Sequence, residues 1–171
     1  MTPSELAKSG TEHGEQAALF AWARMAEKYG FSAANDPRSY SSSVTALEYW
    51  ERSDTPEAAV RGCLALLHAI PNGGQRHKAV AGKMKAEGVK RGVPDVCLPV
   101  PRGPWHGLYI EMKKAGELKS TSDDQRFWIR NLRLLGYYAV VRDSWHTAAA
   151  TIQEYLTCAT NLRIENEPII Y

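Results

Sequence analysis

The residue types best suited to chemistry in this chain lie between Asp95 and Lys113. Asp95 ends a Gly-Val-Pro-Asp sequence, and Glu111 and Lys113 flank a methionine at the end of an apolar run. Two carboxylates can hold a hard divalent cation, which polarises a phosphate oxygen and lowers the pKa of a bound water. A neighbouring lysine can orient or deprotonate that water and offset the charge of a scissile phosphate. The combination predicts a metal-dependent phosphodiesterase centre.

Two apolar segments on either side of a turn predict how these residues meet. Residues 95–100 and 107–112 predict two strands, and the Pro-Arg-Gly-Pro-Trp-His sequence between them carries turn residues. If the strands form an antiparallel hairpin that closes at Gly103, Asp95 and Glu111 become cross-strand neighbours, about 4.5–5.5 Å apart at Cβ. Like charges at that distance destabilise a sheet unless a cation lies between them. A divalent metal is the simplest candidate.

The residues that follow Glu111 fit the same site. Lys113 lies two positions further along the strand and therefore points to the same face, whereas the Met112 side chain points into the core and its carbonyl stays near the metal. The alternative is a surface hairpin in which Glu111 and Lys113 pair in solvent. The apolar Tyr-Ile sequence before Glu111 favours a buried strand instead.

A first helix is predicted over residues 11–29, ending at Gly30. Its apolar residues recur at helical spacing: Ala18, Leu19, Trp22, Met25 and Tyr29. Glu15 shares their inward face. It is either a first-turn glutamate favoured by the helix dipole or an acid placed there for chemistry.

Basic residues gather immediately before Asp95. Two helices are predicted at 44–52 and 55–62, followed by a strand at the end of 64–70 and a Pro-Asn-Gly-Gly turn. A further helix is predicted over 75–87. We take His68, in that strand, as structural. The candidate phosphate contacts are Arg76, Lys78, Lys83, Lys85, Lys90 and Arg91, with Lys114 beyond the motif. A solvated face is the usual fate of such a run, but its place beside the predicted metal site favours contact with phosphates.

The last third of the chain predicts a helix, a strand and a helix. Ser122 opens the first helix, with Gln125 at capping-box spacing, and Gly136 ends it. Its apolar face is predicted to comprise Phe127, Trp128, Ile129, Leu132 and Leu135. A strand at 137–141 and a helix at 144–156 follow, the latter with four inward residues: Ala148, Ile152, Tyr155 and Leu156. Residues 160–171 form a tail whose apolar end could dock on another subunit.

The bulk properties narrow the class of protein. A chain of 171 residues suits one domain, and a net charge of +2 is too small to indicate nucleic-acid binding by itself. The three cysteines form neither a zinc pattern nor a disulfide framework, which favours a reducing cytoplasm. The N-terminus lacks an apolar signal core, and no run approaches the ~18 apolar residues of a membrane span. No glycine-rich phosphate loop is present, so we expect no nucleotide cofactor.

In this order the elements resemble the VRR-NUC family, the virus-type replication-repair nuclease branch of the restriction-endonuclease-like PD-(D/E)xK superfamily. The resembling residues are the Glu15-Gln16 pair, the Pro-Asn-Gly-Gly turn with Arg76, Gly92 to Asp95, Gly107 to Lys113, and Gln125. The best-matched block covers residues 66–156. Residues 36–62 depart from the minimal pattern as a helical insertion after the first helix.

The resemblance implies an α/β fold with a restriction-endonuclease-like core, a central mixed sheet flanked by helices. It implies a Mg²⁺ or Mn²⁺ site, of one metal or two, made by Asp95, Glu111 and the Met112 carbonyl, with Lys113 handling the water. Glu15 would reach the metal directly or through water. Gln125 would lie near the site, in place of its capping role or together with it.

The resemblance also implies partners. Short members of the family are often bacterial or phage proteins, so we expect the cytoplasm of a bacterium or a phage-infected host cell. They tend to form homodimers, and some cleave branched DNA such as four-way junctions.

Three alternatives differ from this nuclease hypothesis. A catalytically silent DNA-binding module would show an eroded site, but here every expected residue is present. A phosphodiesterase acting on nucleotides or RNA is a second alternative, although a long basic helix suits a polymer better than a mononucleotide. An assembly protein with an accidental motif would show no affinity for divalent metals.

Overall fold

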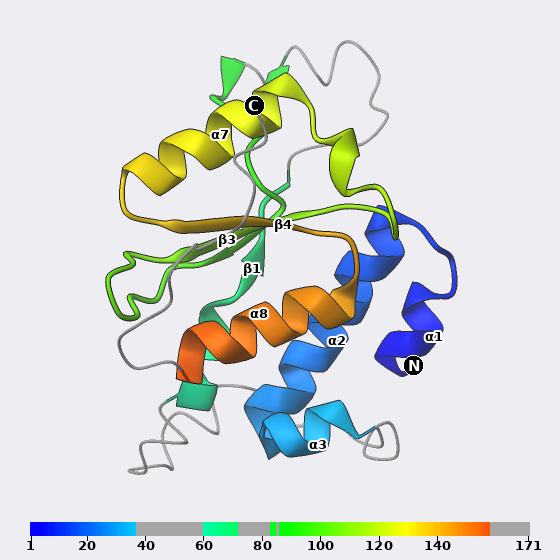
Figure 1. Ribbon diagram of the computed structural model, residues 1–171. Helices are drawn as coiled ribbons and strands as arrows, with labels where there is room; N and C mark the ends of the chain where they lie inside the picture. The colour runs from blue at the N-terminus through cyan, green and yellow to red at the C-terminus, as the bar shows by residue number, and fades with distance from the viewer. Residues whose placement is uncertain (37–59, 72–82, 85, 158–171) are drawn as a thin grey trace.

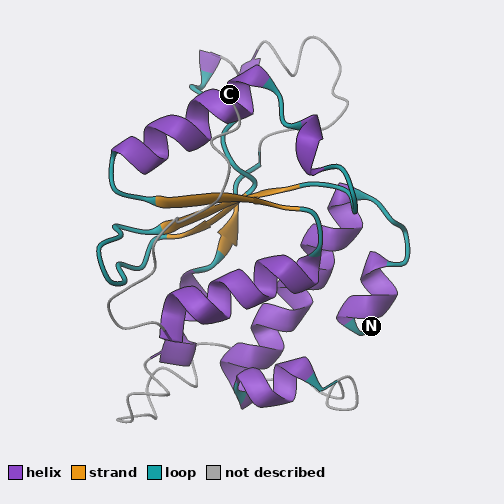
Figure 2. Ribbon diagram, viewed as in Figure 1, coloured by secondary structure: helices purple, strands orange, loops and turns teal. Residues whose placement is uncertain are grey.

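A mixed sheet sandwiched between helices forms the centre of the molecule (Figures 1 and 2). The computed structural model describes residues 1–36, 60–71, 83–84 and 86–157. Within these ranges the sheet has four strands in the order β1-β2-β3-β4: His68–Ala69, Val96–Leu98, Leu108–Met112 and Tyr138–Arg142. The first three strands pair antiparallel, and β3 and β4 pair in parallel. The predicted α/β fold with a mixed sheet is confirmed.

Helices cover both faces of this sheet. In Figure 1, α7 (Asp123–Leu134) lies on one face, and α2 (Glu12–Tyr29) and α8 (Trp145–Thr157) lie on the other. The shorter helices are α1 (Pro3–Ala7), α3 (Phe31–Asn35) and the 3₁₀ turns η2 (Cys63–Leu66) and η3 (Leu118–Ser120). Because successive side chains of a strand point to opposite faces, β4 serves two cores. Val140 belongs to the large core with α2 and α8, and Val141 to a small one under α7.

The predicted hairpin is present in the predicted register. The last pairs of its ladder are Leu98 with Leu108 and Val96 with Ile110. Its tip closes where Arg102 and Trp105 exchange backbone hydrogen bonds of 3.0 and 2.9 Å. Gly103 adopts a φ of 52° there, in the left-handed region that glycine enters without steric cost. The turn residues and the two apolar runs were therefore enough to predict which residues face each other across the hairpin.

Helix α2 follows the predicted pattern except at its C-terminal end. Thr11 accepts a hydrogen bond from the Gly14 N–H at 3.0 Å and so caps the N-terminus, and the helix ends before Gly30. Trp22 and the other central apolar residues are buried. Tyr29 is 44% exposed, however, and its ring lies under the Lys28 ammonium, so its predicted place on the inward stripe is wrong.

Helix α7 departs most clearly from its predicted burial. Ile129 and Leu132 are buried and Trp128 is half-buried, but Phe127 and Leu135 are 64% and 65% exposed, so their predicted inward positions are wrong. The helix lies on the sheet along a narrow stripe that contacts β4. Since each residue turns the helix by about 100°, Phe127 lies on nearly the opposite side from Ile129.

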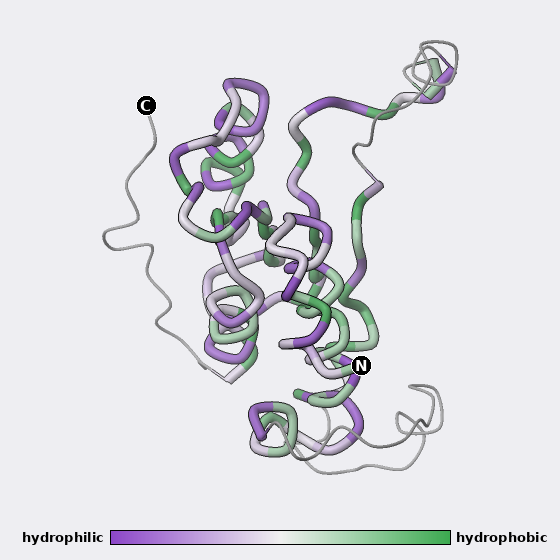
Figure 3. Tube along the Cα trace, turned by 90° about the vertical axis from the view of Figure 1, so that its right-hand side faces the viewer, coloured by the Kyte–Doolittle hydropathy of each residue, from purple (hydrophilic) through white to green (hydrophobic). Residues whose placement is uncertain are grey.

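The remaining predictions fall into two groups. Helix α8 buries all four residues predicted to point inward, and β1 ends the segment 64–70 as predicted. In the tube of Figure 3, apolar and polar colours alternate along the helices, as expected for elements with one buried side.

Several predicted elements lie outside the described residues: the helix at 44–52, most of the helices at 55–62 and 75–87, the turn at 72–74 and the tail at 160–171. Among the described helices, none is both long enough and apolar enough to span a membrane.

Candidate active site

Asp95 and Glu111 face each other at the end of the β2–β3 hairpin. They continue the observed register by one residue beyond the pair of Val96 and Ile110. The Asp95 carboxylate accepts a hydrogen bond from the Met112 N–H, with Oδ2 and N 2.9 Å apart. This bond holds Asp95 against the end of β3, where Glu111 is placed. The Met112 side chain is buried in the large core, as predicted.

The Glu111 carboxylate is almost completely buried and only partly bonded. Its exposed fraction is 1%. Its Oε1 accepts from the Lys113 ammonium, with Nζ and Oε1 3.0 Å apart, and from the Gln125 amide. Its Oε2 is buried and, within the described part of the chain, accepts no hydrogen bond, although a proton shared between the Glu111 and Asp95 carboxyl groups would bond the two. A buried oxygen left without a donor is costly, and it is the kind of ligand that a hard divalent cation takes.

Burial dominates the electrostatics of these carboxylates. Burial and, after it, the neighbouring Asp95 charge raise the pKa of Glu111 to about 8, against the lowering effect of Lys113. Burial also raises the pKa of Asp95, against the opposing effect of the Met112 hydrogen bond. Both acids resist ionisation because burial disfavours the charged form of each, and the Asp95 charge adds to this effect at Glu111. A divalent cation bound there would take the place of the proton on Glu111.

Lys113 remains an ammonium in this environment. Burial alone would lower its pKa, but the hydrogen bond to Glu111 and the nearby carboxylates outweigh burial, and the net shift is upward. The residue is 4% exposed, so its charge is held inside the site. Lys113 lies on the same face as Glu111, as predicted, and the two groups pair inside the protein and not in solvent as in the alternative.

Helix α2 contributes two acids with different partners. Glu15 is buried as predicted, and its Oε2 accepts from the Trp145 N–H at 2.7 Å, which caps the first turn of α8. Glu12, which the sequence analysis missed, extends toward the site, with its Oε1 3.5 Å from the Lys113 Nζ. Its position one helical turn before Glu15 was the signal that could have found it. Across the described residues, no three His, Cys, Asp or Glu side chains are grouped to hold an ion.

Gln125 performs both of the roles that its position suggested. Its side-chain oxygen accepts from the Ser122 N–H at 2.8 Å, and its own N–H donates to the Ser122 hydroxyl at 3.3 Å, which completes the capping box. Its amide nitrogen donates to Glu111. One glutamine thus ties the start of α7 to the carboxylate of β3.

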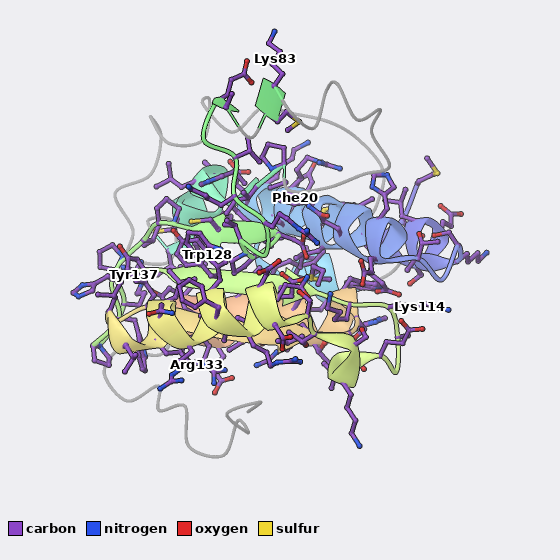
Figure 4. All side chains as sticks on the ribbon, turned by 90° about the horizontal axis from the view of Figure 1, so that it is seen from above. Phe20, Lys83, Lys114, Trp128, Arg133 and Tyr137 are labelled. Carbon is purple, nitrogen blue, oxygen red and sulfur yellow. The ribbon has the colours of Figure 1, made fainter. Side chains whose placement is uncertain are left out.

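The predicted phosphate contacts are exposed where they are described. Lys83, Lys90, Arg91 and Lys114 all reach solvent, and Figure 4 shows Lys83 and Lys114 projecting from the ribbon. Three of them form open ion pairs: Lys83 with Glu87 at 3.9 Å, Arg91 with Asp124 at 3.6 Å and Lys114 with Glu117 at 3.5 Å. Exposed ion pairs of this kind contribute little to stability. Each cation can therefore leave its carboxylate partner and bind another anion at little cost. Arg76, Lys78 and Lys85 lie outside the described residues.

The sequence model of the VRR-NUC domain matches residues 40–145, more than half of the chain. The chain belongs to the VRR-NUC family. A solved structure titled "VRR_NUC domain protein" is similar to it, with 30% sequence identity and a TM-score of 0.51. That similarity covers 67% of this chain and 84% of the other. No curated protein matches.

Membership places the chain in a family of nucleases, for which DNA is the implied substrate. The VRR-NUC match contains Asp95, Glu111, Lys113 and Gln125 and leaves α2 outside. The match begins at residue 40, inside the predicted insertion of residues 36–62, and so does not mark where that insertion starts or ends. The limits of the insertion stay a prediction.

Proposed function

We propose that this VRR-NUC protein is a divalent-metal-dependent DNA endonuclease. The observation that carries the proposal is the pair of opposed carboxylates, Asp95 and Glu111, with the buried Glu111 Oε2 left open beside Lys113. Oxygen ligands in this number suit Mg²⁺ or Mn²⁺. Asp95, Glu111 and the Met112 carbonyl would hold the ion, which when bound supplies Lewis-acid polarisation of a phosphate oxygen and activation of water.

The other residues of the site position groups and protons. Lys113, held as an ammonium, donates a hydrogen bond that orients the attacking water and offsets charge on the phosphate. The water oxygen forms a bond to phosphorus and gives its proton to solvent as the bond to the 3′ oxygen breaks. A second water gives that 3′ oxygen its proton, and the hydroxide it leaves is neutralised by the proton released from the attacking water. Gln125 fixes the orientation of Glu111. Glu15 is proposed to reach the cation, directly or through water, with the oxygen that does not bond Trp145.

The substrate is proposed to lie along the exposed cations that precede Asp95. Lys90 and Arg91 belong to the loop that leads into β2, so a phosphate bound there lies close in sequence to the site. We further propose a homodimer and a preference for branched DNA such as a four-way junction. Two copies would offer two sites for two strands. Family resemblance supports this finer step.

Cleavage assays test the proposal directly. Wild type, Lys113→Ala and Asp95→Asn would be incubated with labelled linear, flapped and four-way-junction DNA in Mg²⁺, in Mn²⁺ and with chelator. Glu154→Gln, an exposed acid on α8, is the matched control. We expect metal-dependent cutting by wild type and control alone, with DNA binding retained by both site variants.

Three outcomes would overturn parts of the proposal. Cutting by either site variant at the wild-type rate would show that the site is assigned wrongly. Tight binding without cutting on every DNA would favour the silent DNA-binding module. Cutting of an RNA substrate in preference to DNA would redirect the proposal to another nucleic acid.

A further inference from the structure

The loop of residues 88–94, which leads into catalytic Asp95, is packed against the start of α7. The indole Nε1 of Trp128 donates to the Arg91 carbonyl at 2.9 Å. The Arg91 guanidinium also lies 3.6 Å from the Asp124 carboxylate, although its side chain is 93% exposed. In Figure 4, Trp128 lies on the side of α7 toward the segment of Lys83, and Arg133 on the other side. The backbone of the loop, more than its side chains, is therefore what α7 holds.

Because Gly92 has no side chain, its backbone can lie directly against Asp124 in the first turn of α7. A Cβ at this position would come within 2.4–2.6 Å of backbone and Cβ atoms of Asp124. The φ of Gly92 is +77°, in the left-handed region. Any side chain here would push the loop away from α7, and the loop continues through the buried Pro94 directly into Asp95.

The same two turns of α7 also hold the other carboxylate. Gln125 donates to Glu111, while Asp124 and Trp128, on either side of it in sequence, contact the loop. Glu111 lies on β3 and Asp95 directly precedes β2. Sheet register sets their backbones and the Met112 N–H holds the Asp95 carboxylate, but neither contact holds the loop before Asp95. Helix α7 is one rigid element that contacts the approach to the first acid and the side chain of the second.

We propose that the first two turns of α7 clamp the 88–94 loop and so set the position of Asp95 relative to Glu111, with Trp128 and Gly92 as positioning residues. The inference rests on the proposed nuclease function. A displacement of about 1 Å at a reacting centre can cost about 10²-fold in rate even when its origin lies outside the chemistry. The clamp therefore acts mainly on kcat and on the metal requirement. Lys90 and Arg91 belong to the same loop, but their side chains are exposed, so we expect the effect on DNA affinity to be smaller.

Two glycines of this loop give a matched test. Gly88 and Gly92 both have positive φ, +93° and +77°, but a Cβ at Gly88 would meet no atom of the described residues within 4 Å. Gly88→Ala and Gly92→Ala thus carry similar backbone strain, and only Gly92→Ala displaces the loop from α7. We expect Gly92→Ala to lower kcat about 10²-fold with little change in KM, and Gly88→Ala to remain within about threefold of wild type.

Trp128 gives a second, independent test. Trp128→Phe keeps an aromatic ring and removes the N–H that holds Arg91. Its control is Phe127→Leu, the exposed neighbour on the outer side of α7. We expect Trp128→Phe to lower kcat about tenfold and to raise the Mg²⁺ concentration needed for half-maximal rate, with Tm nearly unchanged and the control unaffected. Adding Gly92→Ala should not multiply the loss, because both changes release the same contact.

Limited trypsin cleavage after Lys90 and Arg91 measures the clamp without using activity. We expect faster cleavage in Gly92→Ala and Trp128→Phe and wild-type rates in both controls. Unchanged kcat in the two variants, or equal losses in the two alanine variants, would overturn the proposal, as would faster cleavage with full activity. An inactive wild type would instead refute the nuclease function, while the trypsin result would still report whether α7 holds the loop.

Discussion

Glu111 is a buried acid whose two carboxylate oxygens are bonded unequally. One of its oxygens accepts from Lys113 and Gln125, and the other is buried without a partner among the described residues. An orphaned buried oxygen costs about 1–3 kcal/mol. Proteins retain such groups where activity needs them, and removing them often increases stability. The destabilising feature is thus the group that the proposed metal site would use.

The raised pKa of Glu111 predicts how stability depends on pH in the absence of metal. In the unfolded chain this acid loses its proton near pH 4.5, whereas in the folded chain burial keeps the proton until about pH 8. Between these values the folded state binds more protons, so stability falls as pH rises. At about 1.4 kcal/mol per pKa unit the loss is on the order of several kcal/mol.

Glu111→Gln removes this dependence. With chelator present, we expect the variant to be on the order of 2–4 kcal/mol more stable than wild type at pH 8 and close to it at pH 5. Urea denaturation at the two pH values measures the difference. Parallel stability profiles for the two proteins would show that Glu111 ionises normally in the folded state.

A cation bound between the acids should reverse the same penalty. Mn²⁺ at about 100 times its Kd would stabilise wild type by about 2.7 kcal/mol. We expect a rise in Tm at pH 8 that is absent in Asp95→Asn and Glu111→Gln and present in Glu154→Gln. An equal rise in all four proteins would place the bound metal outside this pair.

At the residue scale, the sequence predicted pairs that depend on local register and missed those that depend on packing. The facing of Asp95 and Glu111 follows from the midpoint of one short turn. The bond of Glu15 to Trp145 joins residues far apart in the chain, which no spacing reveals. Glu12 was missed although it lies one helical turn before Glu15, because its partner, Lys113, follows a strand that is distant in the chain.

Helix α7 combines a structural and a chemical task at its first turn. The capping box of Ser122 and Gln125 satisfies backbone groups that a helix start leaves open. The amide nitrogen of the same glutamine is then free to reach Glu111. A helix N-terminus thus supplies a rigid mount for a site residue, which is more exact than a loop would be.

Two alanine variants separate these tasks. Ser122→Ala removes the hydroxyl acceptor but keeps the backbone N–H that holds the Gln125 side chain, so we expect a loss of about 1 kcal/mol in stability and near wild-type kcat. Gln125→Ala removes both roles, and we expect a similar loss of stability with a much larger loss of kcat. Denaturation and single-turnover cleavage measure the two effects. Equal activity in the variants would confine Gln125 to capping.

At the element scale, the spacing of apolar residues predicted the helix α7 but not how many of these residues the sheet buries. Ile129 and Leu132 contact β4, whereas Phe127 and Leu135 face solvent although all four belong to one apolar pattern. A single helix lying on a sheet buries a narrow stripe. The position of the helix on the sheet decides which of its apolar residues belong to the buried stripe.

At the scale of the whole molecule, the site lies where the two sides of the sheet are brought together. Helix α2 below the sheet brings Glu12 to Lys113, and α7 above it brings Gln125 to Glu111 (Figure 1). The hairpin of β2 and β3 could be predicted from turn residues. The parallel pairing of β3 with β4 follows from the helix between them. The packing of α2 onto β3 could not be predicted, because it depends on side chains from distant parts of the chain.

The distribution of charge predicts how DNA binding responds to salt. For double-stranded DNA, log K falls with log salt by about 0.9 for each phosphate neutralised. Lys90→Gln with Arg91→Gln should therefore weaken binding on every DNA sequence and reduce the slope by about 2, whereas Asp95→Asn should leave the slope unchanged.

Fluorescence anisotropy at several salt concentrations measures these slopes. Arg24→Gln, an exposed cation on α2 across the sheet from α7, is the control. A net charge of only +2 means that overall charge cannot account for a steep slope, so a local change at Lys90 and Arg91 would locate the path of the DNA. An unchanged slope would mean that these cations are a solvated face, and that the clamp on their loop serves Asp95 alone.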